Sequence, residues 1–266
     1  MDTKSKSRRK INRDQPGGYA LITGAANGIG ESTAWKFARN NYKVFLVDIQ
    51  EKIHEVVKQI NTELGQEVAF GFVADVSDSK QVDASFDACM KVFDGKLDVL
   101  VNNAGEGIVN PDNTPISIEQ MTNDILTRQF SLNIFSMFYF CKNAVPIMKN
   151  NKHGTIINIG SVSSNGIQSN SHYSASKAAV EGLTKTLARE LAPEITAICL
   201  APGFVDTNLI HRKISKDIQN IALNYTLTKS LIPAWEIANL ILFLSSNDSR
   251  NLTGQILHIN AGMTLR

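Results

Sequence analysis

Thr23-Gly24-Ala25-Ala26-Asn27-Gly28-Ile29-Gly30 is the stretch of this chain that decides the fold. It follows a short apolar run, Tyr19–Thr23, and precedes a segment with helical periodicity, Glu31–Asn40. Glycine permits a tight turn and lets the backbone approach a ligand closely. The start of the next helix offers free N–H groups and the positive end of a dipole. A strand, a glycine-rich turn and a helix in this order favour a dinucleotide phosphate site over a purely structural turn.

Strand-like and helix-like segments alternate from this turn to the end of the chain. The expected strands are Tyr19–Thr23, Lys43–Asp48, Glu67–Ala74, Leu97–Val101, Thr155–Ile159, Ile195–Leu200 and Gln255–Ile259. The expected helices are Glu31–Asn40, Ile49–Leu64, 79–93, 118–149, Ser174–Leu191 and Trp235–Ser245, with an irregular stretch at 204–230. Strands separated by single helices form right-handed crossovers. The pattern predicts an α/β doubly wound Rossmann fold, with a mostly parallel seven-stranded sheet between two helical layers.

Length and composition fit a folded enzyme-sized domain. The chain has 266 residues, 43% of them hydrophobic and 20% charged. Residues 1–16 carry six basic and two acidic side chains, which predicts a solvated basic tail, although contact with nucleic acid or anionic lipid is an alternative. Residues 17–266 are expected to form one domain. We expect no nucleic-acid partner and no membrane span.

Cysteine usage points to a reducing compartment. The three cysteines, Cys89, Cys141 and Cys199, are far apart in the sequence. Their spacing argues against a disulfide scaffold and against a metal site. The tail lacks the apolar segment of a secretory signal. We therefore expect a cytoplasmic protein without bound metal.

Asp48 ends the second predicted strand, 18 residues after Gly30. A carboxylate at that position is placed to accept hydrogen bonds from the adenosine ribose hydroxyls. The alternative is an aspartate that only caps the following helix. A carboxylate would repel the 2′-phosphate of NADP, so we expect NAD as the cofactor and NADP less readily. No compensating arginine is evident, because Ile49 follows Asp48 and Arg39, the nearest earlier arginine, belongs to the end of the first predicted helix.

The spacing T-G-x-x-x-G-I-G resembles the short-chain dehydrogenase/reductase family, in its compact single-domain form, over about residues 17–266. Three further motifs follow predicted strands, namely Asp75-Val76, Asn102-Asn103-Ala104-Gly105 and Pro202-Gly203-Phe204-Val205-Asp206-Thr207. Asn27 stands where NADP-using relatives often carry a basic residue. The resemblance implies cofactor contacts from Gly24, Asn27, Gly28, Ile29, Gly30, Asp48, Asp75, Val76, Asn102, Ala104, Gly105, Tyr173, Lys177, Pro202, Gly203, Val205 and Thr207.

Tyr173 and Lys177 form a Y-x-x-x-K pair, and a spacing of four puts both on one helix face. Tyr225 and Lys229 have the same spacing, so the context must separate the two pairs. Tyr173 lies 12 residues after Ser161, which ends an apolar strand. Tyr225 has no such serine upstream. We therefore predict that Tyr173 is catalytic and that Tyr225 is not.

Hydride chemistry on a ketone or alcohol needs a proton donor or acceptor. A free tyrosine has a pKa of about 10, and Lys177 and oxidised nicotinamide would both lower it. By resemblance, Lys177 also binds the nicotinamide ribose, and Asn133, within the apolar run Phe130–Phe140, holds a water that relays protons. Ser161 would donate to the substrate oxygen. The interval to Tyr173 is one residue shorter than usual in the family, so Ser163 or Ser164 could compete with Ser161.

These residues predict an NAD(H)-dependent oxidoreductase that interconverts a secondary alcohol and a ketone. One alternative is reduction of a 3-oxoacyl thioester, because Ile237–Met263 resembles the 3-oxoacyl carrier-protein reductases. Another is a dinucleotide-binding regulator without turnover. By resemblance, and because Phe130–Phe140 is so apolar, we expect a homotetramer or homodimer.

The substrate side is less determined by the sequence. The polar loop Ser163–His172 suggests a small hydroxylated substrate rather than a steroid. Residues 208–230 are expected to form a substrate lid. His172 and His211 are expected to be exposed loop histidines.

Overall fold

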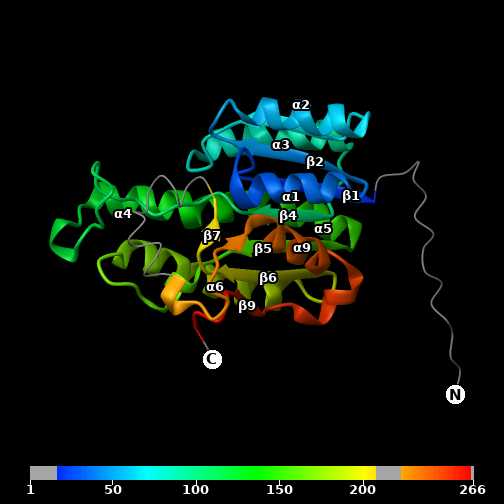
Figure 1. The fold of residues 1–266 in the computed structure, drawn as a ribbon. Helices are drawn as coiled ribbons and strands as arrows, with labels where there is room; N and C mark the ends of the chain where they lie inside the picture. Colours follow the sequence, from blue (N-terminus) through cyan, green and yellow to red (C-terminus); the bar gives the residue numbers. More distant parts are fainter. Residues whose placement is uncertain (1–16, 208–222, 265–266) are drawn as a thin grey trace, which may run out of the picture.

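A seven-stranded sheet forms the centre of the protein (Figure 1). The computed structural model describes residues 17–207 and 223–264, so the predicted tail and most of the predicted lid, with His211, lie outside the described residues. Every strand pairing in this sheet is parallel, and the order is β3-β2-β1-β4-β5-β6-β9. The strands are β1 (Gly18–Thr23), β2 (Tyr42–Asp48), β3 (Ala69–Val73), β4 (Val99–Asn102), β5 (Gly154–Ile159), β6 (Ile195–Pro202) and β9 (Ile256–Ile259). The predicted Rossmann-type sheet is confirmed.

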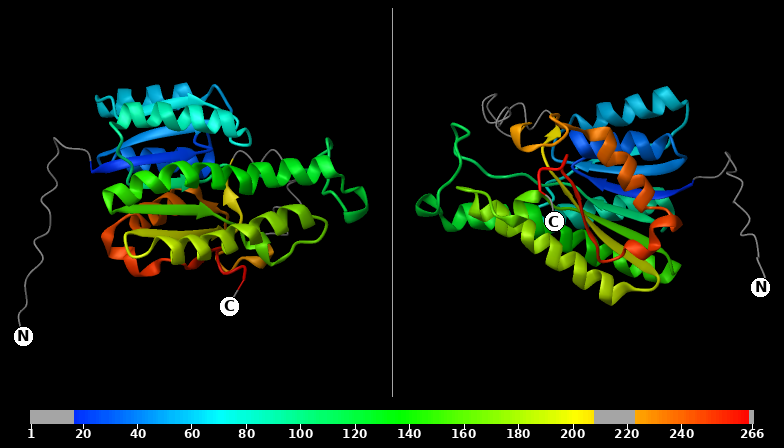
Figure 2. Two further views of the ribbon diagram at one scale, coloured as in Figure 1. Left: turned by 180° about the vertical axis from the view of Figure 1, so that it is seen from behind. Right: turned by 60° about the horizontal axis from the view of Figure 1, so that its bottom comes forward.

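The helices cover both faces of the sheet (Figure 2). On one face lie α1 (Gly28–Ala38), α2 (Ile53–Leu64) and α9 (Ala234–Leu244). On the other face lie α3 (Ser79–Phe93), α5 (Ser136–Asn151) and α6 (Ser171–Leu191). Shorter elements are α4 (Asn123–Phe130), η1 (Ile118–Gln120), η2 (Ser131–Phe135), η3 (Val162–Asn165), η4 (Asn247–Leu252), and the small parallel pair β7 (Val205–Asp206) and β8 (Ile232–Pro233).

Alternation along β1 shows why the sheet is buried on both sides. Ala20 and Ile22 pack with α1, α2 and α9, whereas Leu21 packs with the opposite layer. All three side chains are fully buried. Because neither face meets water, the strands appear in the sequence as continuous apolar runs rather than as alternating patterns.

The strand order reverses between β1 and β4, and this reversal positions the site. From β1 the chain continues to β2 and β3 on one side and then returns to β4 on the other. The loops that leave β1 and β4 at their carboxyl ends therefore diverge. This divergence opens a crevice at the topological switch point, where ligands bind in open α/β sheets.

Four predicted helices differ from the structure by more than one residue, and two of them differ only where they begin: α2 begins at Ile53 rather than Ile49, and α6 begins at Ser171 rather than Ser174. The segment 118–149 is not one helix but η1, α4, a π-helical turn η2, and α5. The first helix begins at Gly28 rather than Glu31, so its N-terminal turn lies within the glycine-rich motif. The helix therefore brings its free N–H groups directly to the switch point.

Candidate active site and cofactor cleft

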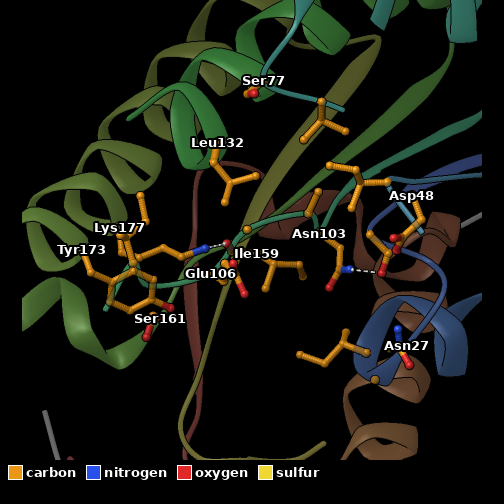
Figure 3. A pocket seen from close by; sticks show the side chains of 18 of the residues that line it. Asn27, Asp48, Ser77, Asn103, Glu106, Leu132, Ile159, Ser161, Tyr173 and Lys177 are labelled. Carbon is orange, nitrogen blue, oxygen red and sulfur yellow. Dashed lines mark hydrogen bonds between the residues drawn. The ribbon is translucent and has the colours of Figure 1, made fainter. Parts of the chain in front are cut away.

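A cleft of about 620 Å³ runs along the carboxyl ends of the strands (Figure 3). Tyr173, Lys177 and Ser161 lie at one end, and Asp48 and Asn27 lie at the other. The predicted residues that line it are Gly24, Asn27, Gly28, Ile29, Asp48, Asp75, Val76, Ala104, Gly105, Ser161, Tyr173, Lys177, Pro202, Gly203, Val205 and Thr207. A volume of this size is typical of a small-molecule or cofactor site.

Gly30, Asn102 and Asn133 were also predicted as site residues but do not line the cleft. A Cβ on Gly30 would collide with the carbonyl oxygen of Gly24, so this glycine permits the turn to close. The Asn102 amide points into the core, where its Nδ2 donates to Asn158 Oδ1 at 2.8 Å. Both residues shape the wall of the site, and their predicted contacts with the cofactor stay predictions.

The glycine-rich turn is held against the segment after β4. Gly24 has a φ of +64°, and a Cβ there would come within 2.9 Å of Ala104 Cα. Asn103 Nδ2 donates to the carbonyl oxygens of Thr23 at 2.8 Å and Gly24 at 3.0 Å. Two of the motifs noted in the sequence therefore form one backbone cradle, which a side chain at position 24 would obstruct.

Asp48 lies at the far end of the cleft with both carboxylate oxygens engaged. Its Oδ2 accepts from Ala26 N at 2.9 Å, and its Oδ1 accepts from Gln50 N at 2.9 Å. The residue is only 6% exposed, yet it lines the cleft. Each carboxylate oxygen can accept more than one hydrogen bond. Asp48 is therefore fixed by the backbone and still able to accept from ribose hydroxyls.

The sequence shows no arginine that would compensate Asp48, but it did not reveal the role of Lys52 at the glycine-rich turn. Lys52, four residues later, donates from Nζ to Asn27 Oδ1 at 2.8 Å and to Ala26 O at 2.9 Å. Its spacing from Asp48 was the only available signal, and that spacing has no general meaning. Arg39, the basic residue at the C-cap of α1, pairs instead with Glu63 at 2.7 Å.

Asp75 and Val76 form the side of the cleft next to β3. Asp75 Oδ1 accepts from the backbone N of Ser77 at 2.9 Å and from its hydroxyl at 2.7 Å. Val76 is 5% exposed and packs into the core beneath α3. The carboxylate is thus held by a local turn, and its position at the end of β3 suits an adenine contact.

Tyr173 and Lys177 lie on adjacent turns of α6, and Ser161 lies at the end of β5. Lys177 is 3% exposed, and its Nζ donates to Ile159 O at 2.8 Å. The same nitrogen lies 5.8 Å from the centre of the Tyr173 ring. The Ser161 side chain is close enough to the Tyr173 hydroxyl to lower its pKa. Ser161, Tyr173 and Lys177, which the sequence suggested for acid–base chemistry, therefore lie together in the folded protein.

Ser161, rather than Ser163 or Ser164, is the serine that reaches the cleft. Its hydroxyl donates to Ser163 Oγ at 3.0 Å and accepts from Ser163 N at 3.1 Å. Ser163 is buried behind it, and neither Ser163 nor Ser164 lines the cleft. Ser163 therefore orients Ser161 instead of competing with it.

Burial controls the protonation of the catalytic pair. It lowers the pKa of Lys177 to about 8, because the ammonium loses its hydration. It also raises the pKa of Tyr173; the nearby Ser161 hydroxyl opposes this rise, and the Glu106 carboxylate adds to it. The expected depression of the tyrosine pKa by Lys177 is therefore absent in the protein alone. Glu106 lines the cleft and was missed in the sequence analysis.

Asn133 lies in the π-helical turn η2 and is fully buried. Its Oδ1 accepts from Glu106 N at 3.1 Å, and its Nδ2 donates to Ser176 Oγ at 3.0 Å. A Cβ on Gly105 would come within 2.8 Å of Asn133 Oδ1 and 3.5 Å of Lys177 Nζ. Glycine at position 105 thus lets the amide and the ammonium approach the same stretch of backbone. Single π-helical turns are frequent at functional sites.

His172 and Tyr225 are two other residues that the sequence brought into consideration for the site. His172 is not exposed in a loop but only 1% exposed in the first turn of α6, where its Nε2 donates to Ile108 O at 2.9 Å. Tyr225 is 66% exposed and does not line the cleft.

Within residues 17–207 and 223–264, no group of three or more His, Cys, Asp or Glu side chains could hold a metal ion. Nor does this part of the chain contain a helix long and apolar enough to cross a bilayer.

Known proteins match this chain over nearly its whole length. A family model described as "Enoyl-(Acyl carrier protein) reductase" matches residues 24–264. Two 3-oxoacyl-[acyl-carrier-protein] reductases are similar to it, from Staphylococcus aureus (35% identical, 92% of this chain and 97% of the relative) and Buchnera aphidicola (34%, 92% and 96%).

Two solved structures are also similar. One is a 7α-hydroxysteroid dehydrogenase complexed with NADH and 7-oxo glycochenodeoxycholic acid, with a TM-score of 0.85, 32% identity, and coverage of 93% of this chain and 94% of that one. The other is a 3-ketoacyl-(acyl-carrier-protein) reductase from Brucella melitensis complexed with NADH, with a TM-score of 0.84, 29% identity, and coverage of 94% and 99%. The chain therefore belongs to the short-chain dehydrogenase/reductase family, whose oxidoreductases act on CH–OH groups with NAD(P).

Proposed function

We propose that this protein is an NAD(H)-dependent dehydrogenase that interconverts a secondary alcohol and a ketone. The observation that carries the proposal is the arrangement of one continuous cleft. Asp48 lies at the end suited to an adenosine ribose, and Ser161, Tyr173 and Lys177 lie together at the other end. A dinucleotide extended between these ends would bring its nicotinamide to the tyrosine.

The bound nicotinamide would supply the hydride acceptor or donor. When a ketone is reduced, Tyr173 would give its hydroxyl proton to the substrate oxygen, and in alcohol oxidation it would take that proton back. Ser161, which lies beside Tyr173 in the cleft, would donate to the same substrate oxygen. Lys177, fixed by Ile159 O, would bind the nicotinamide ribose and return a proton to Tyr173. Asn133 would hold a relay water next to Lys177.

For the substrate, we favour a small, neutral, hydroxylated compound. Glu106 lines the cleft beside Tyr173, and a carboxylate there disfavours an anionic substituent near the reacting carbon. Residues 165–169 of the loop before α6 are exposed and polar or small except for Ile167. Reduction of a 3-oxoacyl thioester is the second candidate, because two of the relatives and one structural neighbour are named for that activity.

Substitution of the two tyrosines tests the proposed function. Tyr173→Phe removes the transferable proton and keeps the ring, so turnover should fall by about 10²–10⁴-fold while NADH affinity changes only a few-fold. Tyr225→Phe, at an exposed position with the same Y-x-x-x-K spacing, is the matched control and should retain normal turnover.

The assay follows NADH absorbance with three substrates: a hydroxylated secondary alcohol, a 3-oxoacyl thioester and a 7-hydroxysteroid. Preferential turnover of the thioester would replace the favoured substrate with the second candidate. A Tyr173→Phe enzyme with normal turnover would refute the catalytic assignment. NADH binding without turnover of any substrate would favour a dinucleotide-binding regulator.

A further inference from the structure

Lys52 lies where the β2–α2 connection meets the glycine-rich turn. Its Nζ donates to Asn27 Oδ1 at 2.8 Å and to Ala26 O at 2.9 Å, and it lies 3.4 Å from Glu31 Oε2. The Lys52 side chain is 39% exposed and that of Glu31 is 28% exposed. Ion pairs as exposed as this one contribute little free energy. The two hydrogen bonds to the turn therefore matter more than the contact with Glu31.

The same two turn residues are also held by neighbours of Lys52 in the sequence. Ala26 N donates to Asp48 Oδ2 at 2.9 Å, and Asn27 Nδ2 donates to Gln50 Oε1 at 3.2 Å. Both polar ends of the Ala26 backbone and both ends of the Asn27 amide thus bind the segment 48–52. Lys52 is the one cation among these partners, and it contributes two of the four hydrogen bonds.

This arrangement orients a peptide group at the cleft. In a trans peptide, the carbonyl oxygen of one residue and the N–H of the next point in opposite directions. Because Lys52 holds the Ala26 carbonyl, the Asn27 N–H points away from Lys52. Asn27 lines the cleft, and N–H groups that follow a strand and precede a helix are the groups that bind phosphate.

We propose that Lys52 is a positioning residue of the cofactor site. Its ammonium holds the glycine-rich turn against the segment that begins with Asp48. The parts of the site that would bind the pyrophosphate and the ribose are therefore assembled before the cofactor binds. This inference rests on the proposed NAD(H) binding. A preassembled site binds more tightly because less conformational freedom is lost on binding. The ammonium also adds a positive charge near the anionic pyrophosphate.

The test is an NADH titration of the full-length protein, in which binding is measured by fluorescence energy transfer from the protein to the nucleotide. Lys52→Met keeps the apolar stem and removes the ammonium. We expect its Kd for NADH to rise about 5- to 30-fold, while kcat at saturating NADH stays within about twofold, as for the loss of one or two charge-assisted hydrogen bonds. Lys52→Arg retains the charge and the donors and should recover most of the affinity.

Two controls separate positioning from other roles. Lys58→Met removes an exposed lysine from α2, the helix that Lys52 precedes, and should leave the Kd unchanged. Glu31→Gln removes the ion pair but not the hydrogen bonds to the turn, and should also leave the Kd unchanged. The thermal midpoint of each variant without cofactor reports any general loss of stability.

Several outcomes overturn the inference. The inference would be overturned if the Kd of Lys52→Met for NADH were within twofold of the wild-type value. It would also be overturned if Lys58→Met lost as much NADH affinity as Lys52→Met. A lowered thermal midpoint with unchanged NADH affinity would make Lys52 a purely structural residue. Wild-type protein that fails to bind NADH would refute the proposed function itself, which keeps the two failures distinguishable.

Discussion

Replacement of Asp48 by alanine should shift the cofactor preference from NADH toward NADPH. The 2′-phosphate of NADPH carries a charge of about −2. Two like unit charges about 4 Å apart repel by roughly 4 kcal/mol at an effective dielectric constant of ~20. Screening at the ribose edge and the Lys52 ammonium beside Asn27 both reduce this repulsion, to about 1–3 kcal/mol. The wild type should therefore prefer NADH by about tenfold to a hundredfold.

The variant loses more than a charge. Without the Asp48 carboxylate, the N–H groups of Ala26 and Gln50 lose their acceptor, and the ribose hydroxyls lose theirs. We expect kcat/KM for NADH to fall about tenfold or more, and kcat/KM for NADPH to fall less or to rise. The assay measures kcat/KM for both cofactors with one substrate at low and high salt. The wild-type preference should narrow at high salt, because screening weakens the repulsion.

Addition of Asn27→Arg to Asp48→Ala should move the preference further, since it supplies a cation for the 2′-phosphate. The gain will be limited, because an arginine at position 27 removes the Oδ1 acceptor of Lys52 and places a second cation beside it. A wild type that prefers NADPH would refute the role given to Asp48. So would a double variant whose ratio of kcat/KM values does not move toward NADPH.

Two further predictions concern pH and assembly. Glu106→Gln should move the acidic limb of the pH profile for alcohol oxidation to lower pH. Burial raises the pKa of Tyr173, and the Glu106 charge raises it further. Tyr173 must be deprotonated to act as the base, so removal of that charge lets it act at a lower pH. An unmoved limb, or an equal shift in the exposed control Glu119→Gln, would exclude this effect of Glu106. Phe135 and Phe138 are 42% and 51% exposed on one side of η2 and α5, so we expect a homotetramer or homodimer that Phe138→Asp weakens. A light-scattering mass near the 29.2 kDa of one chain at micromolar concentration would contradict this.

The sheet could be predicted from the sequence because its strands are buried on both faces. β5 and β6 are fully apolar or small at nearly every position, and their ends were predicted to within two residues. Tyr173 could be chosen over Tyr225 as the proposed catalytic residue because Ser161, which precedes it, follows one of these strands. Motifs that follow buried strands were therefore located together with the strands.

Features that depend on tertiary contact could not be predicted in the same way. The π-helical turn at η2 could not be recognised in the sequence, because Phe130–Phe140 is apolar at most positions and therefore predicts a buried helix with or without an extra residue. His172 looked polar and exposed, but its Nε2 meets the Ile108 carbonyl from a distant loop. Lys52 contacts Ala26 and Asn27, and Glu106 lies close to Tyr173, so in both cases the neighbours belong to distant segments of the sequence. These segments come together only in the folded chain.

The protonation of the catalytic pair follows from the same burial that makes the site. Burial opposes the charged form of each group, so it lowers the pKa of Lys177 and raises the pKa of Tyr173. Glu106 strengthens the second effect. The chain alone therefore holds Tyr173 in its protonated form, which is the form that ketone reduction uses. In the proposed alcohol oxidation Tyr173 would act as tyrosinate, and the positive charge of a bound oxidised nicotinamide would supply the stabilisation that the protein alone does not. Under the proposed function, the redox state of the cofactor would therefore set the charge beside Tyr173 and with it the protonation state that each direction of the reaction needs.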